Sequence, residues 1–358
     1  MVRFPLAEGA IEATAKRVPE VNDIVVRSGV LSPNRVVLHN YPISNPIAVF
    51  NPAASIDGEY LKVYARIILG YYMYVSNIVE MAIPLEDIFQ GYVNTNTYSG
   101  DLVIYPSTKY DIWGTEDPRV TVIDGEKYMV YTGRSINYFN PVFRKNRTLP
   151  IAAVYDKKRR AWIKKYVFIP SEEVFGEVVS DKDALLYKVG DTIYLFHRPH
   201  LSDESFHLVV SKVELKKSRD ELAEVVVDNA YTVLAVPDFE SKIGWGTPPV
   251  PLNESGDRVV MFLHGVDRDE VVYRVFAAKL KLRGEEIVVE AVTPRYIMEP
   301  RTPYEIIGDR PAVVFPCGAV KIDKERVLVT YGAADFVTAF GIVDINALLA
   351  ELDRGRIY

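Results

Sequence analysis

The stretch Trp113-Gly114-Thr115-Glu116-Asp117-Pro118-Arg119-Val120-Thr121 places two adjacent carboxylates between a Trp-Gly pair and a β-branched run. The proline biases Asp117 toward an extended backbone, and the residues that follow have strand character. We therefore expect Glu116 and Asp117 at the start of a strand, where side chains can converge on a ligand. On these nine residues alone, a turn with two solvated acids is an equally good interpretation.

Five short motifs of small or polar residues recur along the chain at a nearly constant spacing. One position from each gives steps of 66, 66, 66 and 67 residues, through Asn51, Asp117, Asp183, Pro249 and Pro316. A turn followed by a strand with an alternating residue pattern recurs at the same spacing as these motifs, at residues 57–66, 124–134, 189–198, 255–265 and 323–335. Such a period, built from short strands, is typical of radial repetition. The sequence predicts an all-β fold, a five-bladed β-propeller with a central axial active-site pocket; a coincidental period is the weaker alternative.

The repeat also predicts the domain organisation. We expect an N-terminal extension at residues 1–45 that packs on the propeller, a catalytic propeller at 46–345, and a short C-terminal helix or tail at 346–358. Leu6–Arg17 is a helical candidate in the first part, and Leu348–Asp353 is one in the last.

The composition excludes several classes of function. Of 358 residues, 49% are hydrophobic and 25% are charged, which is ordinary for a globular protein. The net charge of −6 disfavours a nucleic-acid partner. Cys317 is the single cysteine, so neither an intramolecular disulfide nor a Cys-based metal site is expected. No apolar stretch is long enough for a signal peptide or a membrane span, so we expect a cytoplasmic protein. Gln90 is the only glutamine, a weak indication of a thermophilic source.

In a propeller the innermost strands line the axis, so motifs 66 residues apart become neighbours. The residues expected there are Asn51, Glu116, Asp117, Lys182, Asp183 and Asp335, with Arg66, Arg134, His197, Arg198 and His264 at the ends of the second strands. A few acids among several permanent cations suit a polyhydroxylated substrate and an anionic attacking species.

Two reactions fit these residue types. Inverting glycoside hydrolysis needs two carboxylates, which Asp117 with Asp335 or Glu116 could supply. In phosphorolysis, phosphate is itself the nucleophile and needs cations to hold it rather than a base. The three cations Arg134, Lys182 and Arg198 fit phosphorolysis better.

Each charged candidate also has a structural interpretation. Arg66 and Arg134 could form salt bridges between blades, and Lys182 could lie in a surface hairpin. His197 and His264 lie at strand ends in apolar runs, where a structural histidine is somewhat more common than a catalytic one.

The remaining candidates also have two interpretations each. Asp335 could bind substrate or bond the backbone of a turn. Trp113, Trp245 and Tyr110 could stack on sugar rings or pack in the core. The sequence contains no metal-ligand cluster, Ser-His-Asp elbow or Gly-rich phosphate loop.

Taken in order, ten motifs between about residues 45 and 340 resemble glycoside hydrolase family 130, the β-mannoside phosphorylases. They are Asn51-Pro52-Ala53, Tyr64-Ala65-Arg66, Gly114-Thr115-Glu116-Asp117-Pro118-Arg119, Lys182-Asp183-Ala184, His197-Arg198-Pro199, Gly244-Trp245-Gly246-Thr247-Pro248-Pro249, His264-Gly265-Val266, Tyr304-Glu305, Phe315-Pro316-Cys317-Gly318 and Tyr331-Gly332-Ala333-Ala334-Asp335. The ordered series is more specific than any single motif.

The resemblance implies a five-bladed propeller that phosphorolyses a β-mannoside with inversion, giving α-mannose 1-phosphate and a shortened acceptor. By position, Asp117 would be the general acid, passing its proton through a mannose hydroxyl. The implied phosphate-binding residues are Arg134, Lys182, His197 and Arg198. The implied substrate-binding residues are Asn51, Arg66, Glu116, Asp335, His264, Trp245 and Tyr304. Inorganic phosphate would be a co-substrate, with no cofactor and no metal.

Two rivals stay open: a β-mannoside hydrolase that uses two carboxylates, and a carbohydrate-binding propeller without catalysis. The linkage and the acceptor sugar also stay open, because the loops expected to shape the acceptor side, Ser135–Asn146 and Leu85–Tyr98, match nothing in the family pattern. Expected partners are a mannoside and phosphate, with a possible homo-oligomer, and neither nucleic acid nor a membrane.

Overall fold

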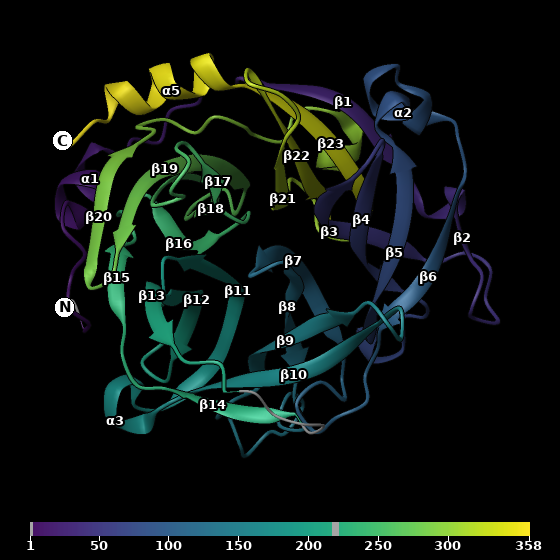
Figure 1. The fold of residues 1–358 in the computed structure, drawn as a ribbon, viewed down its shortest axis with the longest axis horizontal. Helices are drawn as coiled ribbons and strands as arrows, with labels where there is room; N and C mark the ends of the chain where they lie inside the picture. Colours follow the sequence, from purple (N-terminus) through teal and green to yellow (C-terminus); the bar gives the residue numbers. More distant parts are fainter. Residues whose placement is uncertain (1–2, 217–221) are drawn as a thin grey trace.

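The computed structural model describes residues 3–216 and 222–358, most of which lie in short β-strands. The strands form antiparallel arrays that follow one another around a central space in the order of the chain (Figure 1). The prediction of an all-β protein is confirmed.

The described strands fall into five arrays. The first holds β3 (Ala48–Asp57), β4 (Tyr60–Ile68), β5 (Ser76–Pro84), β6 (Tyr98–Ile104) and β2 (Val36–Leu38). The second holds β7 (Thr115–Ile123), β8 (Glu126–Arg134), β9 (Thr148–Asp156), β10 (Ala161–Pro170) and β14 (Ala223–Val227), and the third holds β11 (Val178–Val189), β12 (Thr192–Leu201), β13 (Leu208–Val213) and β15 (Tyr231–Leu234). The fourth holds β16 (Glu240–Trp245), β17 (Val250–Pro251), β18 (Arg258–Asp267), β19 (Tyr273–Arg283) and β20 (Glu286–Val292), and the fifth holds β21 (Val314–Lys321), β22 (Arg326–Ala333), β23 (Val337–Asp344) and β1 (Val25–Leu31).

The helices are short and lie between the strands or at the chain ends. They are α1 (Ala10–Lys16), α2 (Leu85–Phe89), α3 (Glu172–Phe175), α4 (Pro303–Ile306) and α5 (Ile345–Arg354), with 3₁₀ turns at Pro33–Arg35, Tyr72–Tyr74 and Tyr92–Asn94. No helix in the described ranges is long and apolar enough to cross a membrane.

Hydrogen bonding groups the five arrays into four sheets. The second and third arrays share one nine-stranded sheet because Ser180 of β11 forms a parallel bridge with Thr148 of β9. The other three sheets are separate, and each is one array.

The N-terminal segment takes part in two of these sheets. β1 pairs antiparallel with β23, so a strand from the start of the chain completes the sheet formed by the last strands. β2 pairs in parallel with β6 of the first array. The segment expected to pack on the propeller as an extension thus supplies edge strands to both ends of the strand series.

The terminal helices differ slightly from those expected. The first is shorter than Leu6–Arg17, because Leu6 forms a β-bridge with Thr232 and the helix begins only after Gly9, whose φ is 78°. The last is longer than Leu348–Asp353. The side chain of Asp344 accepts a hydrogen bond from the backbone of Ala347 at 2.8 Å, which caps the helix and starts it earlier.

The repeated motifs are β-bulges in the strands nearest the centre. The pairing register shifts at Asn51, Asp117, Asp183 and Cys317, while in the fourth array residues 246–249 separate β16 from β17. Asn51, Asp117 and Asp183 have φ of 49°, 50° and 55°. Asparagine and aspartate tolerate this left-handed conformation better than most residues. A bulge re-aims the side chain that it carries, and these three side chains all face the central cavity.

Hydrophobic residues fill the space between neighbouring arrays. Trp245 is fully buried between the third and fourth arrays, where its ring packs edge-on against Phe196 at 5.0 Å. Its indole nitrogen donates to the backbone oxygens of His197 and Val209, each at 3.1 Å. These bonds satisfy the indole N–H inside the core and fix the two arrays against each other.

Candidate active site

A cavity of about 460 Å³ opens at the centre of the arrays, where the bulged strands meet. Its lining is polar and comes from all five arrays and from the loops between them. It consists of Asn51, Arg66, Tyr74, Glu116, Asp117, Arg134, Tyr138, Ser180, Lys182, Asp183, Arg198, His200, Phe206, Lys242, His264, Tyr273, Arg310, Phe315 and Asp335.

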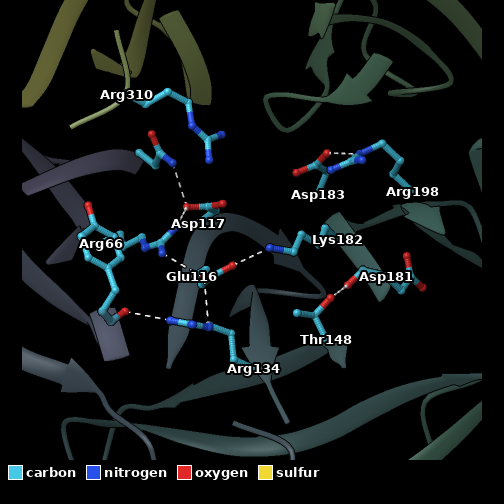
Figure 2. Close-up of polar contacts among 12 residues, drawn as sticks. Arg66, Glu116, Asp117, Arg134, Thr148, Asp181, Lys182, Asp183, Arg198 and Arg310 are labelled. Carbon is cyan, nitrogen blue, oxygen red and sulfur yellow. Dashed lines mark hydrogen bonds and ion pairs between the residues drawn. The ribbon is translucent and has the colours of Figure 1, made fainter. Parts of the chain in front are cut away.

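Glu116 lies at the centre of a cluster of three cations (Figure 2). Its Oε1 accepts a hydrogen bond from Arg66 at 2.9 Å and lies 3.6 Å from Nε of Arg134, while its Oε2 accepts from Lys182 at 2.8 Å. Burial alone would raise the pKa of Glu116, but these three charges lower it to about 2. Glu116 is therefore a permanent anion that orients three basic side chains.

Asp117 presents its two carboxylate oxygens differently. Oδ1 accepts from Asn51 at 2.8 Å and from Arg66 at 3.2 Å. Within the described ranges, Oδ2 has no hydrogen-bond partner. One oxygen is thus fixed by neighbouring strands and the other is available to a substrate in the cavity.

Asp183 forms a second charged cluster on the other side of the cavity. Its Oδ2 accepts from Nε of Arg198 at 2.5 Å, and its Oδ1 lies 3.6 Å from Arg119. Burial opposes ionisation, yet the charges of Arg198 and Arg119 hold the pKa of Asp183 well below its usual range. Gly244 faces this cluster so closely that a Cβ there would lie 2.4 Å from Asp183 Oδ2. The glycine leaves room for the carboxylate.

Asp335 lies at the rim of the cavity, 3.5 Å from Nε of Arg310. Burial raises the pKa of Asp335, and the anions Asp117 and Glu116 act in the same direction, although Arg310 and Arg66 oppose them. Asp335 is therefore the cavity acid that takes up a proton most readily among those whose pKa is shifted.

His264 is fully buried beside Asp183, with its Nε2 3.6 Å from Asp183 Oδ2, and packs on Phe315 at 4.5 Å. Neither of its ring nitrogens has a hydrogen-bond partner in the part of the chain that the structure describes. Burial lowers the pKa of His264 to about 3, helped by the charges of Arg198 and Lys242. The ring is neutral at physiological pH.

Asp183, expected at the axis from the repeat, lines this one cavity, and so do nine of the twelve residues to which the family resemblance gives a role. They are Asn51, Arg66, Glu116, Asp117, Arg134, Lys182, Arg198, His264 and Asp335. Their convergence follows from the equivalent bulges and strand ends on which they lie.

His197 does not line the cavity. Its side chain is fully buried, with Nδ1 2.7 Å from Asp181 Oδ2 and Nε2 2.8 Å from Ser211 Oγ. Successive side chains of a strand point to opposite faces, so Arg198 faces the cavity while His197 faces the core. Both ring nitrogens lie within hydrogen-bond distance of protein side chains, so this geometry does not support a direct contact between His197 and phosphate.

Trp245 and Tyr304 also lie outside the cavity lining. Trp245 is the core residue described above. Tyr304, in α4, packs against the hydrophobic cluster of the fourth and fifth arrays. Of the two other aromatic candidates, neither Trp113 nor Tyr110 lines the cavity; Trp113 packs edge-on against Phe139 at 5.2 Å.

The two loops expected to shape the acceptor side behave differently. Ser135–Asn146 contributes Tyr138, whose ring lies 3.9 Å from the guanidinium carbon of Arg134. Leu85–Tyr98 contributes nothing to the lining, and α2 within it lies at the outer edge of the molecule (Figure 1). That expectation was wrong for the second loop, because it follows β5 at the end away from the cavity.

Sequence reasoning did not assign several lining residues. Tyr74 and Arg310 come from loops that carry no repeated motif, and Phe206, Lys242 and Tyr273 lie outside the two landmarks of the repeat. Arg310 donates to the hydroxyl of Tyr273 at 3.1 Å. One signal in the sequence could have found Lys242. In β16, Lys242 and Gly244 alternate with the buried apolar residues Ile243 and Trp245, which indicates that Lys242 and Gly244 share the opposite face of the strand.

The lining offers cationic donors rather than metal ligands. No group of three or more His, Cys, Asp or Glu side chains suited to a metal ion occurs in residues 3–216 and 222–358. The strongest groups that the cavity can offer to a ligand are guanidinium and ammonium donors, and these suit oxyanions and sugar hydroxyls.

Comparison with known proteins gives consistent matches over most of the chain. A family model of glycoside hydrolase family 130, described as beta-1,4-mannooligosaccharide phosphorylase, matches residues 15–354. A beta-1,2-mannobiose phosphorylase of Thermoanaerobacter sp. (strain X514) is 28% identical over 329 residues, covering 86% of this chain and 96% of the relative. A 1,2-beta-oligomannan phosphorylase from the same strain is 28% identical over 309 residues, covering 84% and 90%.

Solved structures show the same fold. The beta-1,2-mannobiose phosphorylase from Listeria innocua, in complex with beta-1,2-mannobiose, matches with a TM-score of 0.65 and 19% identity. The match covers 93% of this chain and 97% of that chain. At this identity the likeness concerns the fold.

Proposed function

The chain belongs to glycoside hydrolase family 130, and we propose that it is an inverting β-mannoside phosphorylase. It cleaves the terminal β-mannosyl bond with inorganic phosphate and releases α-mannose 1-phosphate and a shortened acceptor. The activities named for its curated relatives support this class of reaction.

The observation that carries the proposal is the charge of the cavity. Six basic side chains line it, Arg66, Arg134, Lys182, Arg198, Lys242 and Arg310, against the four carboxylates Glu116, Asp117, Asp183 and Asp335. This leaves a formal excess of two positive charges, which matches a phosphate dianion. A site that activates water needs a free basic carboxylate rather than surplus cations.

The reaction requires one proton and one nucleophile. A phosphate oxygen attacks the anomeric carbon on the face opposite the leaving oxygen, and the glycosidic C–O bond breaks as the new one forms. Asp117 gives the proton that the leaving oxygen needs, relayed through a hydroxyl of the mannose. The support for this assignment is its free Oδ2 beside an Oδ1 that Asn51 and Arg66 hold in place.

Arg134, Lys182 and Arg198 are the phosphate-binding residues in this proposal. Arg134 is positioned by its bond to the backbone oxygen of Tyr74 at 2.8 Å and by its stacking on Tyr138. Lys182 and Arg198 lie opposite each other in the pairing of β11 with β12. Asn51, Arg66 and Asp335 bind the terminal mannose on the side of the cavity nearest Asp117.

For the architecture we propose a five-bladed β-propeller with the active site on its axis. The five antiparallel arrays, the equivalent bulges in the innermost strands and the pairing of β1 with β23 support it. In a closed propeller such a pairing joins the two ends of the chain in one blade.

A β-mannoside hydrolase is the second candidate, and Asp335 is the observation that favours it. Its pKa is raised, mainly by burial, and a carboxylate of raised pKa is a better base for activating water. In that reaction Asp117 and Asp335 would be the two carboxylates of an inverting hydrolase.

Product analysis separates these candidates. The protein is incubated with β-1,2-mannobiose and, separately, with β-1,4-mannobiose, each with and without inorganic phosphate. We expect α-mannose 1-phosphate only when phosphate is present, and the preferred disaccharide identifies the linkage. Free mannose released at the same rate without phosphate would establish the hydrolase. Saturable sugar binding without product from either disaccharide would point to a binding protein.

A further inference from the structure

The loop between β6 and β7 is held by one fully buried carboxylate, that of Asp111, on which five hydrogen bonds converge. Its Oδ1 accepts from the backbone nitrogens of Ser107 and Thr108, at 3.1 and 2.9 Å, and from Oγ1 of Thr108 at 2.9 Å. Its Oδ2 accepts from the hydroxyl of Tyr131 on β8 at 2.9 Å and from the ammonium group of Lys164 on β10. An acid that has no part in the proposed reaction thus ties the loop to two strands of the second array.

Lys164 completes the same network. Its ammonium group also donates to the backbone oxygen of Tyr105 and to Oγ of Ser107, each at 2.7 Å. Each of its three N–H groups therefore has an acceptor in the loop or next to it. A buried ion pair is costly unless its remaining donors and acceptors are also satisfied. Because they are satisfied here, the pair of Asp111 and Lys164 fixes the loop in one conformation.

The end of this loop bonds to the backbone of Arg134, which we assign to phosphate. Arg134 lies one position beyond Gly133, where the pairing of β8 with β7 ends. Its backbone nitrogen donates to the oxygen of Gly114 at 2.9 Å, and its backbone oxygen accepts from the nitrogen of Trp113 at 3.0 Å. On this side of β8, the loop thus replaces β7 as the hydrogen-bond partner of Arg134.

The side chain of Arg134 also lies on the loop. Gly114 has a φ of 138°, and a Cβ there would lie 3.2 Å from Cδ of Arg134. At Gly133 a Cβ would lie 2.5 Å from the backbone oxygen of Tyr110 and 3.1 Å from Cβ of Asp111, so the loop packs directly against the end of β8. A shift of the loop would therefore move the support of the guanidinium group.

We propose that Asp111 is a positioning residue for phosphate: together with Lys164 it holds the loop that fixes Arg134 in the cavity. The inference rests on the proposed phosphorolysis and deepens it, because it traces the position of a phosphate-binding cation to a buried network behind the cavity lining. Glu116 and Asp117 depend less on the loop, since β7 pairs with β8 on both sides of its bulge. Loss of the Asp111 charge should therefore weaken phosphate binding more than mannoside binding.

The test begins with Asp111→Asn, which keeps the shape of the side chain but turns an NH₂ group toward the ammonium group of Lys164, where two donors then meet. Arg134→Ala and the double variant Asp111→Asn/Arg134→Ala show whether the effect passes through Arg134. Tyr131→Phe removes one of the five hydrogen bonds and keeps both charges, and it decides the question if Asp111→Asn does not fold.

Glu351→Gln is the matched control. Glu351 is also a buried carboxylate and pairs with Arg295 at 2.9 Å, but it lies on α5 at the outer edge of the molecule (Figure 1). For every protein the initial rate is measured against phosphate and against mannoside. Binding of inorganic phosphate is measured by calorimetry, and stability by the midpoint of thermal unfolding.

We expect Asp111→Asn and Glu351→Gln each to lower the unfolding midpoint by about 5 °C. Asp111→Asn should also raise the KM for phosphate by about threefold to thirtyfold and change the KM for mannoside by less than about twofold, whereas Glu351→Gln should leave both KM values at the wild-type level. Tyr131→Phe should raise the KM for phosphate by about twofold to fivefold. In the Arg134→Ala background, Asp111→Asn should add less than about twofold.

A loss of stability in Asp111→Asn with an unchanged KM for phosphate, or an equal rise in both KM values, would overturn the positioning role. The same holds if Arg134→Ala leaves the KM for phosphate unchanged, or if the effect of Asp111→Asn persists in full without Arg134. Where Asp111→Asn does not fold, an unchanged KM for phosphate in Tyr131→Phe overturns it. The proposed phosphorolysis fails separately: in that case the wild-type protein itself shows no dependence on phosphate and no phosphate binding by calorimetry.

Discussion

The two faces of β11 and β12 provide a direct comparison within the molecule. On the cavity face lie Lys182, Asp183 and Arg198, and on the core face lie Asp181 and His197. Asp181 and Lys182, and likewise His197 and Arg198, are adjacent residues that face opposite sides, while the bulge at Asp183 keeps its side chain on the cavity side with Lys182. On the core face Asp181 Oδ2 and both ring nitrogens of His197 have partners inside the protein, while on the cavity face Arg198 and Lys182 border open volume. Both faces thus carry charged and polar side chains, and the two faces differ in whether these side chains reach the cavity.

The largest expected effect concerns the cavity face at the acid Asp117. Asp117→Asn keeps the shape and the ability to accept from Asn51 and Arg66, but it cannot deliver a proton. We expect the rate of phosphorolysis to fall by about 10²- to 10⁴-fold, measured as release of sugar phosphate, with the unfolding midpoint nearly unchanged. Turnover within tenfold of the wild type would remove Asp117 from the role of acid.

The second prediction concerns stability at low pH. Because the pKa of Glu116 falls from its ordinary value of 4.5 to about 2 in the folded protein, its contribution is complete above pH 4.5 and is lost as pH falls toward 2. The linkage amounts to about 3 kcal/mol of unfolding free energy. Chemical unfolding between pH 2 and 5 should show a steeper loss for the wild type than for Glu116→Gln. Parallel curves would mean that the three cations do not stabilise the Glu116 carboxylate.

The third prediction compares the neighbours His197 and Arg198. His197→Ala removes both hydrogen bonds and leaves the buried Asp181 without its partner, so we expect a loss of about 2–3 kcal/mol in unfolding free energy. Arg198→Ala should raise the KM for phosphate by about tenfold or more, with a smaller loss of stability. Denaturant unfolding and phosphate kinetics on both variants measure the two effects.

If His197→Ala raised the KM for phosphate as much as Arg198→Ala without a loss of stability, the division between the two faces would not hold. His197 would then act on phosphate directly, as the family resemblance implied.

The smallest effect is expected away from both faces. Lys188 pairs with Asp124 at 2.7 Å, and the Asp124 side chain is 70% exposed. Exposed ion pairs of this kind contribute little, so Lys188→Ala should change the unfolding free energy by less than about 0.5 kcal/mol and leave activity at the wild-type value. A loss of more than about 2 kcal/mol would show that the contact between the second and third arrays depends on this pair.

Much of the fold could be predicted from the sequence, because each unit of the repeat is built from residues that are close together in the chain. Turn residues and alternating strands predicted β4, β8, β12, β18 and β22 in the order found, and the all-β class followed from them. The edge strands β1, β2 and β14 could not be placed, since each pairs with a strand more than 50 residues away in the sequence. Such pairings depend on which edges the assembled sheets leave open.

The site shows the same division. Residues on the repeated bulges and strand ends, such as Asn51, Asp117 and Arg134, were predicted and do line the cavity. His197 and Trp245 carry plausible motifs but face the core. Lys242 and Arg310 carry no motif and line the cavity nonetheless.

The sequence by itself determined the class of the fold, the period of the repeat and the residue types gathered at its centre, because strand alternation, turns and bulges are encoded within a few neighbouring residues. Only the tertiary structure decided which of two adjacent polar residues reaches the cavity, and which cations there already have partners. Those outcomes depend on the direction of each bulged side chain and on carboxylates from other arrays. In the described residues Lys182 Nζ lies 2.8 Å from a carboxylate oxygen of Glu116, 66 positions away in the sequence, whereas Lys242 has no carboxylate oxygen within 4.0 Å.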